Sequence, residues 1–203
     1  MKYNEFHNLI KEPFFRINDV VVKQSGISSV QLSRWHKAGY IEQIKRGLYS
    51  FKDSKEGLDH NVISFLLYEP SYISLESALR EYNFIPEMVP NITSITTKTT
   101  RTFTNGDVTY FYKHIKPEFF FGYVPVVKEN LKYLIAEPEK ALLDYIYFHQ
   151  DRFDIDGDME EWRLDRIEVK ESVDLAKLKK YAAVFQSSKM EKILNILIKY
   201  ADL

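Results

Sequence analysis

The feature that most constrains the fold is a change of hydrophobic spacing in the N-terminal quarter of the chain. Up to Tyr40, apolar residues recur at three- or four-residue intervals in three short stretches, which is typical of amphipathic helices. From Tyr40 to Phe51 apolar and polar residues alternate, and Gly47 breaks the alternation directly after Lys45 and Arg46. The sequence therefore predicts three short helices, followed by two short strands around a turn at Arg46 and Gly47.

The second and third predicted helices lie on either side of a glycine. The second is expected from about Asn18, a favourable N-cap residue, to the turn at Ser25 and Gly26. The third is expected to start at Ser28 or the next residue and to end at Gly39. Two helices joined by a short glycine-containing turn form the helix-turn-helix pattern, in which the second helix lies in the major groove of DNA. The hairpin that follows would be its wing.

The third helix is expected to turn Leu32 and Trp35 inward, which leaves its polar residues on faces that meet solvent or a ligand. The cations at the tip of the wing are well placed for phosphates or a minor groove. The predicted DNA-binding residues are Ser28, Ser29, Gln31, Ser33, Arg34, Lys37, Lys45 and Arg46. The alternative is a packing or dimerisation module, in which these residues form an ordinary solvated face.

Charge is distributed unevenly along the 203 residues, whose net charge of −1 argues against a wholly basic nucleic-acid binder. From Val20 to Lys52, six cations stand against the single anion Glu42, a net charge of +5. From Asp151 to Lys170, eight anions and four cations give −4. This asymmetry is typical of a protein whose DNA-contacting part is local.

Composition indicates a folded cytoplasmic protein. The chain is 45% apolar and has no cysteine, which excludes disulfides and thiolate metal sites and requires no oxidising compartment. Met1 to Glu12 lacks the apolar core of a signal peptide, and the apolar runs elsewhere are far shorter than the ~18 residues that span a bilayer. We therefore expect no membrane contact.

A series of short motifs extends over most of the stretch from Ser25 to Asp144. They are Gly26-Ile27-Ser28, Leu32, Lys37 to Ile41, Ile44 to Tyr49, Tyr72 to Leu79, Phe121-Gly122-Tyr123 and Ile135 to Asp144. Together they resemble the AbiEi family of antitoxins, transcriptional regulators of abortive-infection, type IV toxin-antitoxin operons. The run from Ala136 to Asp144 is the most specific of them. The resemblance implies repression of the protein's own operon and neutralisation of a cognate nucleotidyltransferase-like toxin, with or without direct contact.

The polar joint from Lys52 to Asp59 divides the chain into a winged helix-turn-helix domain, residues 1–55, and a mixed α+β domain, residues 56–203. In the second domain a helix from His60 to Tyr68 and a short helix capped by Ser74 are expected. A hairpin sheet with a turn at Asn105-Gly106 and a strand at 133–135 follow.

A further helix should begin at Pro138 and continue to about His149, and the chain should end in helices at 174–185 and 188–201. Glu137 and Glu139 would favour the positive start of the first of these helices. Lys140 and Asp144, one turn apart, are expected to pair on the surface. The apolar stripes of the last two helices would pack together or onto a partner; they are Leu175, Leu178, Ala182, Phe185, Ile193, Leu194, Leu197 and Ile198.

Catalysis is not predicted, because the five histidines are scattered and no nucleophile elbow, phosphate loop or dinucleotide fingerprint occurs. The acidic cluster Asp154 to Asp158 does not fit a calcium loop, since its glycine falls at position four, and is interpreted as the cap of a helix at 159–169. No cofactor or metal is expected. Beside the regulator, two hypotheses stay open: a DNA-independent interaction module using the C-terminal helices, and a metal-dependent enzyme centred on this acidic cluster.

Overall fold

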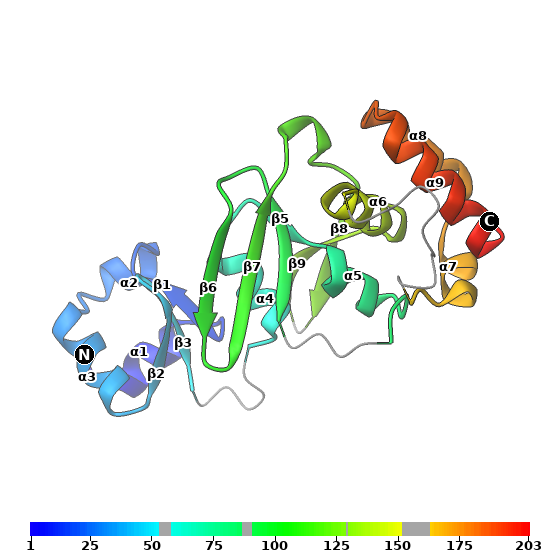
Figure 1. Ribbon diagram of the computed structural model, residues 1–203. Coiled ribbons are helices and arrows are strands. Elements are labelled where there is room, and N and C mark those ends of the chain that lie inside the picture. The colour runs from blue at the N-terminus through cyan, green and yellow to red at the C-terminus, as the bar shows by residue number, and fades with distance from the viewer. Residues whose placement is uncertain (53–57, 87–90, 129, 152–162) are drawn as a thin grey trace. The chain divides into compact units, whose positions relative to one another are not determined.

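The computed structural model describes residues 1–52, 58–86, 91–128, 130–151 and 163–203 (Figure 1). The contacts within the chain divide it into two compact units, Met1–Ile63 and Ser64–Leu203. The predicted α+β class is confirmed, because helices accompany a small antiparallel sheet in the first unit and a larger mixed sheet in the second. No helix of the described chain has the length and apolar character needed to cross a membrane.

The N-terminal unit contains three short helices and a sheet. Its elements are α1 (Tyr3–Leu9), β1 (Phe14–Arg16), α2 (Val20–Gln24), α3 (Ser29–Lys37), β2 (Ile41–Lys45) and β3 (Leu48–Phe51), and α4 (His60–Leu67) contains the boundary with the second unit. The three helices and the β2–β3 hairpin confirm the sequence prediction. Strand β1 was not predicted, because three residues are too few to display an alternating pattern. It pairs with β3, so the strand order is β1-β3-β2.

An aromatic core holds the N-terminal unit together. The ring of Phe6 lies 5.0 Å from that of Phe15 and 5.3 Å from that of Trp35, and Phe15 lies 5.2 Å from Phe51. These rings come from α1, β1, α3 and β3, so one cluster joins two of the helices to the sheet. Leu32 belongs to the same cluster, which confirms that Leu32 and Trp35 form the inner side of α3.

The second unit is built on a six-stranded mixed sheet. Its strands are β4 (Ser71–Ile73), β5 (Ile92–Thr96), β6 (Arg101–Asn105), β7 (Val108–His114), β8 (Tyr123–Lys128) and β9 (Leu131–Ala136), in the order β6-β7-β5-β4-β9-β8. The predicted turn at Asn105 and Gly106 joins β6 to β7, and these two strands pair with each other in antiparallel orientation. Strands β4 and β8 were not recognised in the sequence. The pairs β5–β7 and β4–β9 are parallel, so the sheet is mixed rather than a simple hairpin sheet.

Helices of the second unit cover the sheet and one another. They are α5 (Leu75–Glu81), α6 (Pro138–His149), α7 (Arg166–Ser172), α8 (Leu175–Val184) and α9 (Ser188–Ala201), with a short 3-10 helix η1 (Pro117–Phe119). Helix α6 has the predicted bounds, and α8 and α9 pack against it and against each other (Figure 1). Leu178 and Leu197, from the centres of the two C-terminal stripes, are fully buried. The stripes therefore pack mainly within the unit, which removes the main support for the interaction-module hypothesis.

The segment before α7 departs from the prediction of a helix at 159–169. Asp165 is the N-cap of α7, and its carboxylate accepts hydrogen bonds from the amides of Ile167 and Glu168 at 2.9 and 3.2 Å. The described helix therefore begins at Arg166. The acidic cluster Asp154 to Asp158 lies outside the described residues.

A buried ionic pair in α6 contradicts the prediction of a surface pair. The side chains of Lys140 and Asp144 contact each other, as their spacing predicts, but both have 0% exposure. Lys140 Nζ also donates to Tyr72 Oη at 2.9 Å, and Asp144 Oδ2 accepts from Tyr72 Oη at 3.0 Å and from Ser74 Oγ at 2.8 Å. Spacing identifies the pair but not the face it occupies, because α6 is packed on nearly every side. Ser74 stands at the N-cap of α5, but its hydroxyl serves Asp144 instead of capping.

Three of the motifs that resemble the AbiEi family meet at this pair. Tyr72 and Ser74 come from the motif Tyr72 to Leu79, Gly122 from Phe121-Gly122-Tyr123, and Lys140 and Asp144 from Ile135 to Asp144. Gly122 has φ +70°, and a Cβ there would lie 3.1 Å from the Lys140 side chain and 2.9 Å from the Tyr181 ring. Only glycine fits here without displacing the Lys140 and Tyr181 side chains.

Burial raises the pKa of Asp144 and lowers that of Lys140, because both groups lose the water that stabilises their charged forms. Their mutual contact opposes both shifts. Removing either partner would therefore leave the other charge buried without compensation and destabilise the fold.

We expect Lys140→Met to lower the free energy of unfolding by about 3–5 kcal/mol, because it leaves the Asp144 carboxylate buried without its cation. The double variant Lys140→Met/Asp144→Asn should recover part of this loss, since an amide oxygen still accepts from Tyr72 and Ser74 and no charge is left buried. Urea unfolding of both variants measures the difference. If the double variant is no more stable than Lys140→Met alone, charge burial is not the cause of the loss.

Candidate functional site

The start of α3 is fixed by a capping box. Ser28 Oγ accepts from the Gln31 amide at 3.3 Å, and Gln31 Oε1 accepts from the Ser28 amide at 3.1 Å. Gln31 Nε2 also donates to the Met1 carbonyl at 3.2 Å. Two of the predicted DNA-binding residues thus have side chains already bonded within the unit. The residue at the N-cap of α2 is Asp19, not the expected Asn18, and its side chain makes no capping bond.

The outer face of α3 brings together three of the predicted residues. Ser33, Arg34 and Lys37 are all exposed, and helical spacing puts them opposite the inward Leu32 and Trp35. Ser29 is exposed at the first position of the helix. The face therefore offers two hydroxyls and two cations to solvent.

Sequence reasoning missed one member of this face. Val30 is 58% exposed and stands three, four and seven positions before Ser33, Arg34 and Lys37. Val30 is apolar, whereas the predicted DNA-binding residues are all polar or charged. The helical spacing itself contained the signal.

The wing has the predicted form. Gly47 has φ +83°, a conformation that glycine tolerates, and its carbonyl accepts from the Ile17 amide at 3.0 Å. Lys45 ends β2 and is half-buried, while Arg46 is exposed in the turn. The tip that holds both cations is thus tied to the segment between β1 and α2.

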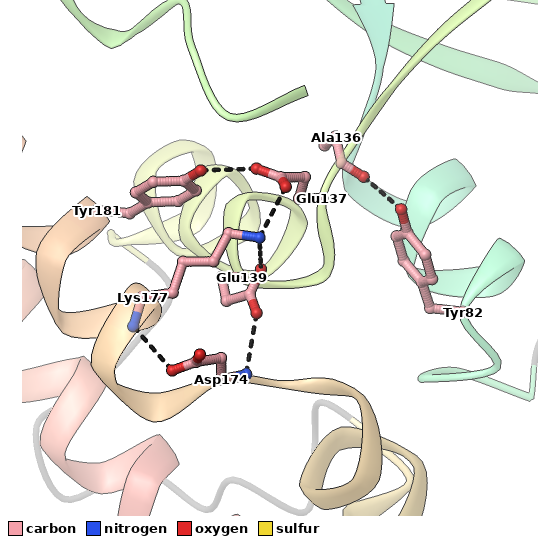
Figure 2. Close-up of polar contacts among 7 residues, drawn as sticks. All are labelled: Tyr82, Ala136, Glu137, Glu139, Asp174, Lys177 and Tyr181. Carbon is pink, nitrogen blue, oxygen red and sulfur yellow. Dashed lines mark hydrogen bonds and ion pairs between the residues drawn. The ribbon is translucent and has the colours of Figure 1, made fainter. Parts of the chain in front are cut away.

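A second polar cluster joins α6 to α8 (Figure 2). Lys177 Nζ contacts Glu137 Oε1 at 2.7 Å and Glu139 Oε2 at 3.2 Å, and Tyr181 Oη donates to Glu137 Oε2 at 2.6 Å. The other Glu139 oxygen accepts from the Asp174 amide at 2.9 Å. Both glutamates lie at the start of α6, as expected, with Glu137 at the N-cap and Glu139 in the first turn, although the Glu137 side chain makes no capping bond. They also bind α8, a partner remote in sequence.

The pKa of Glu137 is lowered by this cluster. Burial tends to raise it, but hydrogen bonds from Lys177 and Tyr181 outweigh burial. Nearby, burial and the two glutamates raise the pKa of Tyr82 to about 12, and Tyr82 Oη donates to the Ala136 carbonyl at 2.7 Å. The cluster connects two helices, and among the described residues no group of histidine, cysteine, aspartate and glutamate side chains could hold a metal ion.

Three short helices followed by a hairpin, with a capped and outward-facing third helix, define the first unit as a winged helix-turn-helix. Residues 7–52 match the family model described as a transcriptional regulator, the AbiEi antitoxin. The matched segment extends from within α1 to the end of the β2–β3 hairpin. Over these residues the chain is therefore similar to the domain of an antitoxin and transcriptional regulator. No curated protein matches the chain.

The shifted pKa of Glu137 makes the α6–α8 connection sensitive to acid. Because the folded-state pKa lies below the ordinary value of 4.5, the stabilisation is present above that value and is lost as the pH falls through the folded-state pKa. We expect Tyr181→Phe to lower the free energy of unfolding by roughly 1 kcal/mol at pH 7, with a smaller effect once the pH falls below the folded-state pKa of Glu137 and its carboxylate is protonated. Urea unfolding at several pH values measures this difference.

Tyr82→Phe is the matched control. It removes a hydroxyl whose acceptor is the Ala136 carbonyl, which does not titrate, so its cost should not depend on pH. A pH-independent cost for Tyr181→Phe as well would contradict the assignment to Glu137.

Proposed function

We propose that this protein represses transcription of its own operon by binding operator DNA with α3 and the wing, and that it is the antitoxin of a nucleotidyltransferase-like toxin. The observation that carries the DNA-binding half is the outer face of α3, where Ser33, Arg34 and Lys37 are exposed beside a fixed inner face. The family model for residues 7–52 supports the same conclusion.

The residues of the proposed interface have three different roles. Arg34, Lys37, Lys45 and Arg46 supply the charge that attracts phosphates, and the wing cations track the backbone or enter a minor groove. Ser29 and Ser33 are short donors and acceptors that fit close to base edges. Ser28 and Gln31, whose side chains form the capping box, act by setting the position of α3 on the duplex.

The antitoxin half is assigned to the second domain, residues 56–203. Its support is the resemblance of Tyr72 to Leu79, Phe121 to Tyr123 and Ile135 to Asp144 to family motifs, together with their convergence on the buried pair Lys140 and Asp144. We assign the protein no catalytic step and no cofactor. Its proposed partner is double-stranded operator DNA, and it neutralises the cognate toxin with or without direct contact.

The DNA-binding half is tested with the duplex upstream of the gene, at ~100 mM salt, where specific complexes persist. Arg34→Ala, Lys37→Ala, Lys45→Ala and Arg46→Ala should each weaken binding. Substitution of a residue that contacts a phosphate should reduce the salt slope of binding by about 0.9. Substitution of a residue that contacts a base should weaken the binding free energy by about 1–3 kcal/mol for the operator sequence alone. Gel shift and fluorescence titrations over a salt series measure both.

Lys192→Ala and Lys199→Ala are the charge-matched controls, because they remove exposed cations from α9. They should leave affinity and salt slope unchanged. The repressor assignment fails if the wild type shifts no upstream DNA, or if the controls weaken binding as much as the interface variants do.

The antitoxin half is tested by co-expression with the adjacent gene from independent promoters. The wild type should restore growth, and the double variant Arg34→Ala/Arg46→Ala should restore it equally, since its changes are confined to the first unit. Colony counts and growth rates give the readout. A harmless neighbour, or toxicity that the wild type does not relieve, would contradict the proposal.

A further inference from the structure

We infer that Val30 reads the methyl group of thymine in the major groove and so gives the operator site a requirement for A·T pairs. The inference rests on the proposed DNA binding and deepens it, because it names the base feature that α3 recognises. Val30 is the second residue of α3, within its first turn. In helix-turn-helix proteins the N-terminal residues of the recognition helix are the ones that reach base edges.

Helical geometry puts Val30 at the centre of the outer face. Residues three, four and seven positions apart lie on one side of a helix, so Val30 shares its side with Ser33, Arg34 and Lys37. Leu32 and Trp35, 6% and 9% exposed, face the aromatic core on the other side. An apolar side chain is thus surrounded by hydroxyls and cations.

Folding of the N-terminal unit gives little reason for valine at this position. Its side chain is 58% exposed, so its apolar surface is largely unburied. A β-branched residue is also a weaker helix former than alanine or a long polar residue. The cap of α3 is provided by Ser28 and Gln31 and does not involve the Val30 side chain.

The neighbours of Val30 favour DNA as the partner. Arg34 and Lys37 on the same face attract an anionic partner, which an apolar protein surface is not. The thymine methyl is the apolar group that a base pair presents in the major groove. A small apolar side chain framed by cations complements a methyl group framed by phosphates.

Deoxyuridine substitution tests this inference, because it removes the thymine methyl and leaves the hydrogen-bonding edge unchanged. In duplexes carrying one thymine→deoxyuridine change at each position of the operator in turn, the wild type should lose about fourfold in affinity at one or two positions. Val30→Ala should bind the thymine and deoxyuridine duplexes equally at those positions. Alanine is the better helix former, so this variant should fold.

Val20→Ala is the matched control, since Val20 is an exposed valine on α2 and 67% accessible. It should retain the full deoxyuridine effect. The inference is overturned if no position responds in the wild type, or if Val30→Ala responds as the wild type does. It is also overturned if Val30→Ala changes the sedimentation coefficient and not the deoxyuridine effect, as a residue used for self-association would.

The two levels of the proposal fail in different ways. A wild type that binds none of the unmodified duplex overturns DNA binding itself. A wild type that binds this duplex tightly but is indifferent to every methyl group leaves repression standing and removes only the role of Val30.

Discussion

The contact of Leu32 and Trp35 with the aromatic core decides which side of α3 is available to a partner. Phe6, Phe15 and Phe51 supply the opposing rings from α1, β1 and β3, so the helix cannot rotate about its axis without breaking the core of the whole unit. The capping box fixes its first turn in the same way. A duplex would thus meet a surface that is already formed, which reduces the entropy cost of binding.

Local signals in the sequence predicted much of this unit. Gly47 between two alternating stretches identified the wing, and Ser28 identified the start of α3, because turns and caps depend on residues close together in the chain. Strand β1 was missed because its three residues show no alternating pattern and its partner β3 is remote in sequence. The outer face of α3 was predicted in part: its polar residues were named, and Val30 was not.

In the second unit, prediction failed where the partner of a charge is remote in sequence. Lys140 and Asp144 were paired correctly but assigned to the surface, because a spacing of four residues does not report what packs against the helix. Glu137 and Glu139 were assigned correctly to the start of α6, but their contacts with Lys177 on α8 were not predicted. The motifs that resemble the AbiEi family in this unit include side chains that hold its interior together, so the resemblance there reflects architecture.

The division of labour within α3 has an evolutionary consequence. Ser28, Gln31, Leu32 and Trp35 are occupied in capping and packing, while the residues interleaved with them contribute little to folding. If α3 binds DNA as proposed, selection can exchange the outward residues one at a time and retarget the protein to a different DNA sequence without destabilising it. Divergence between regulators of neighbouring operons would accumulate at those outward positions and avoid the scaffold.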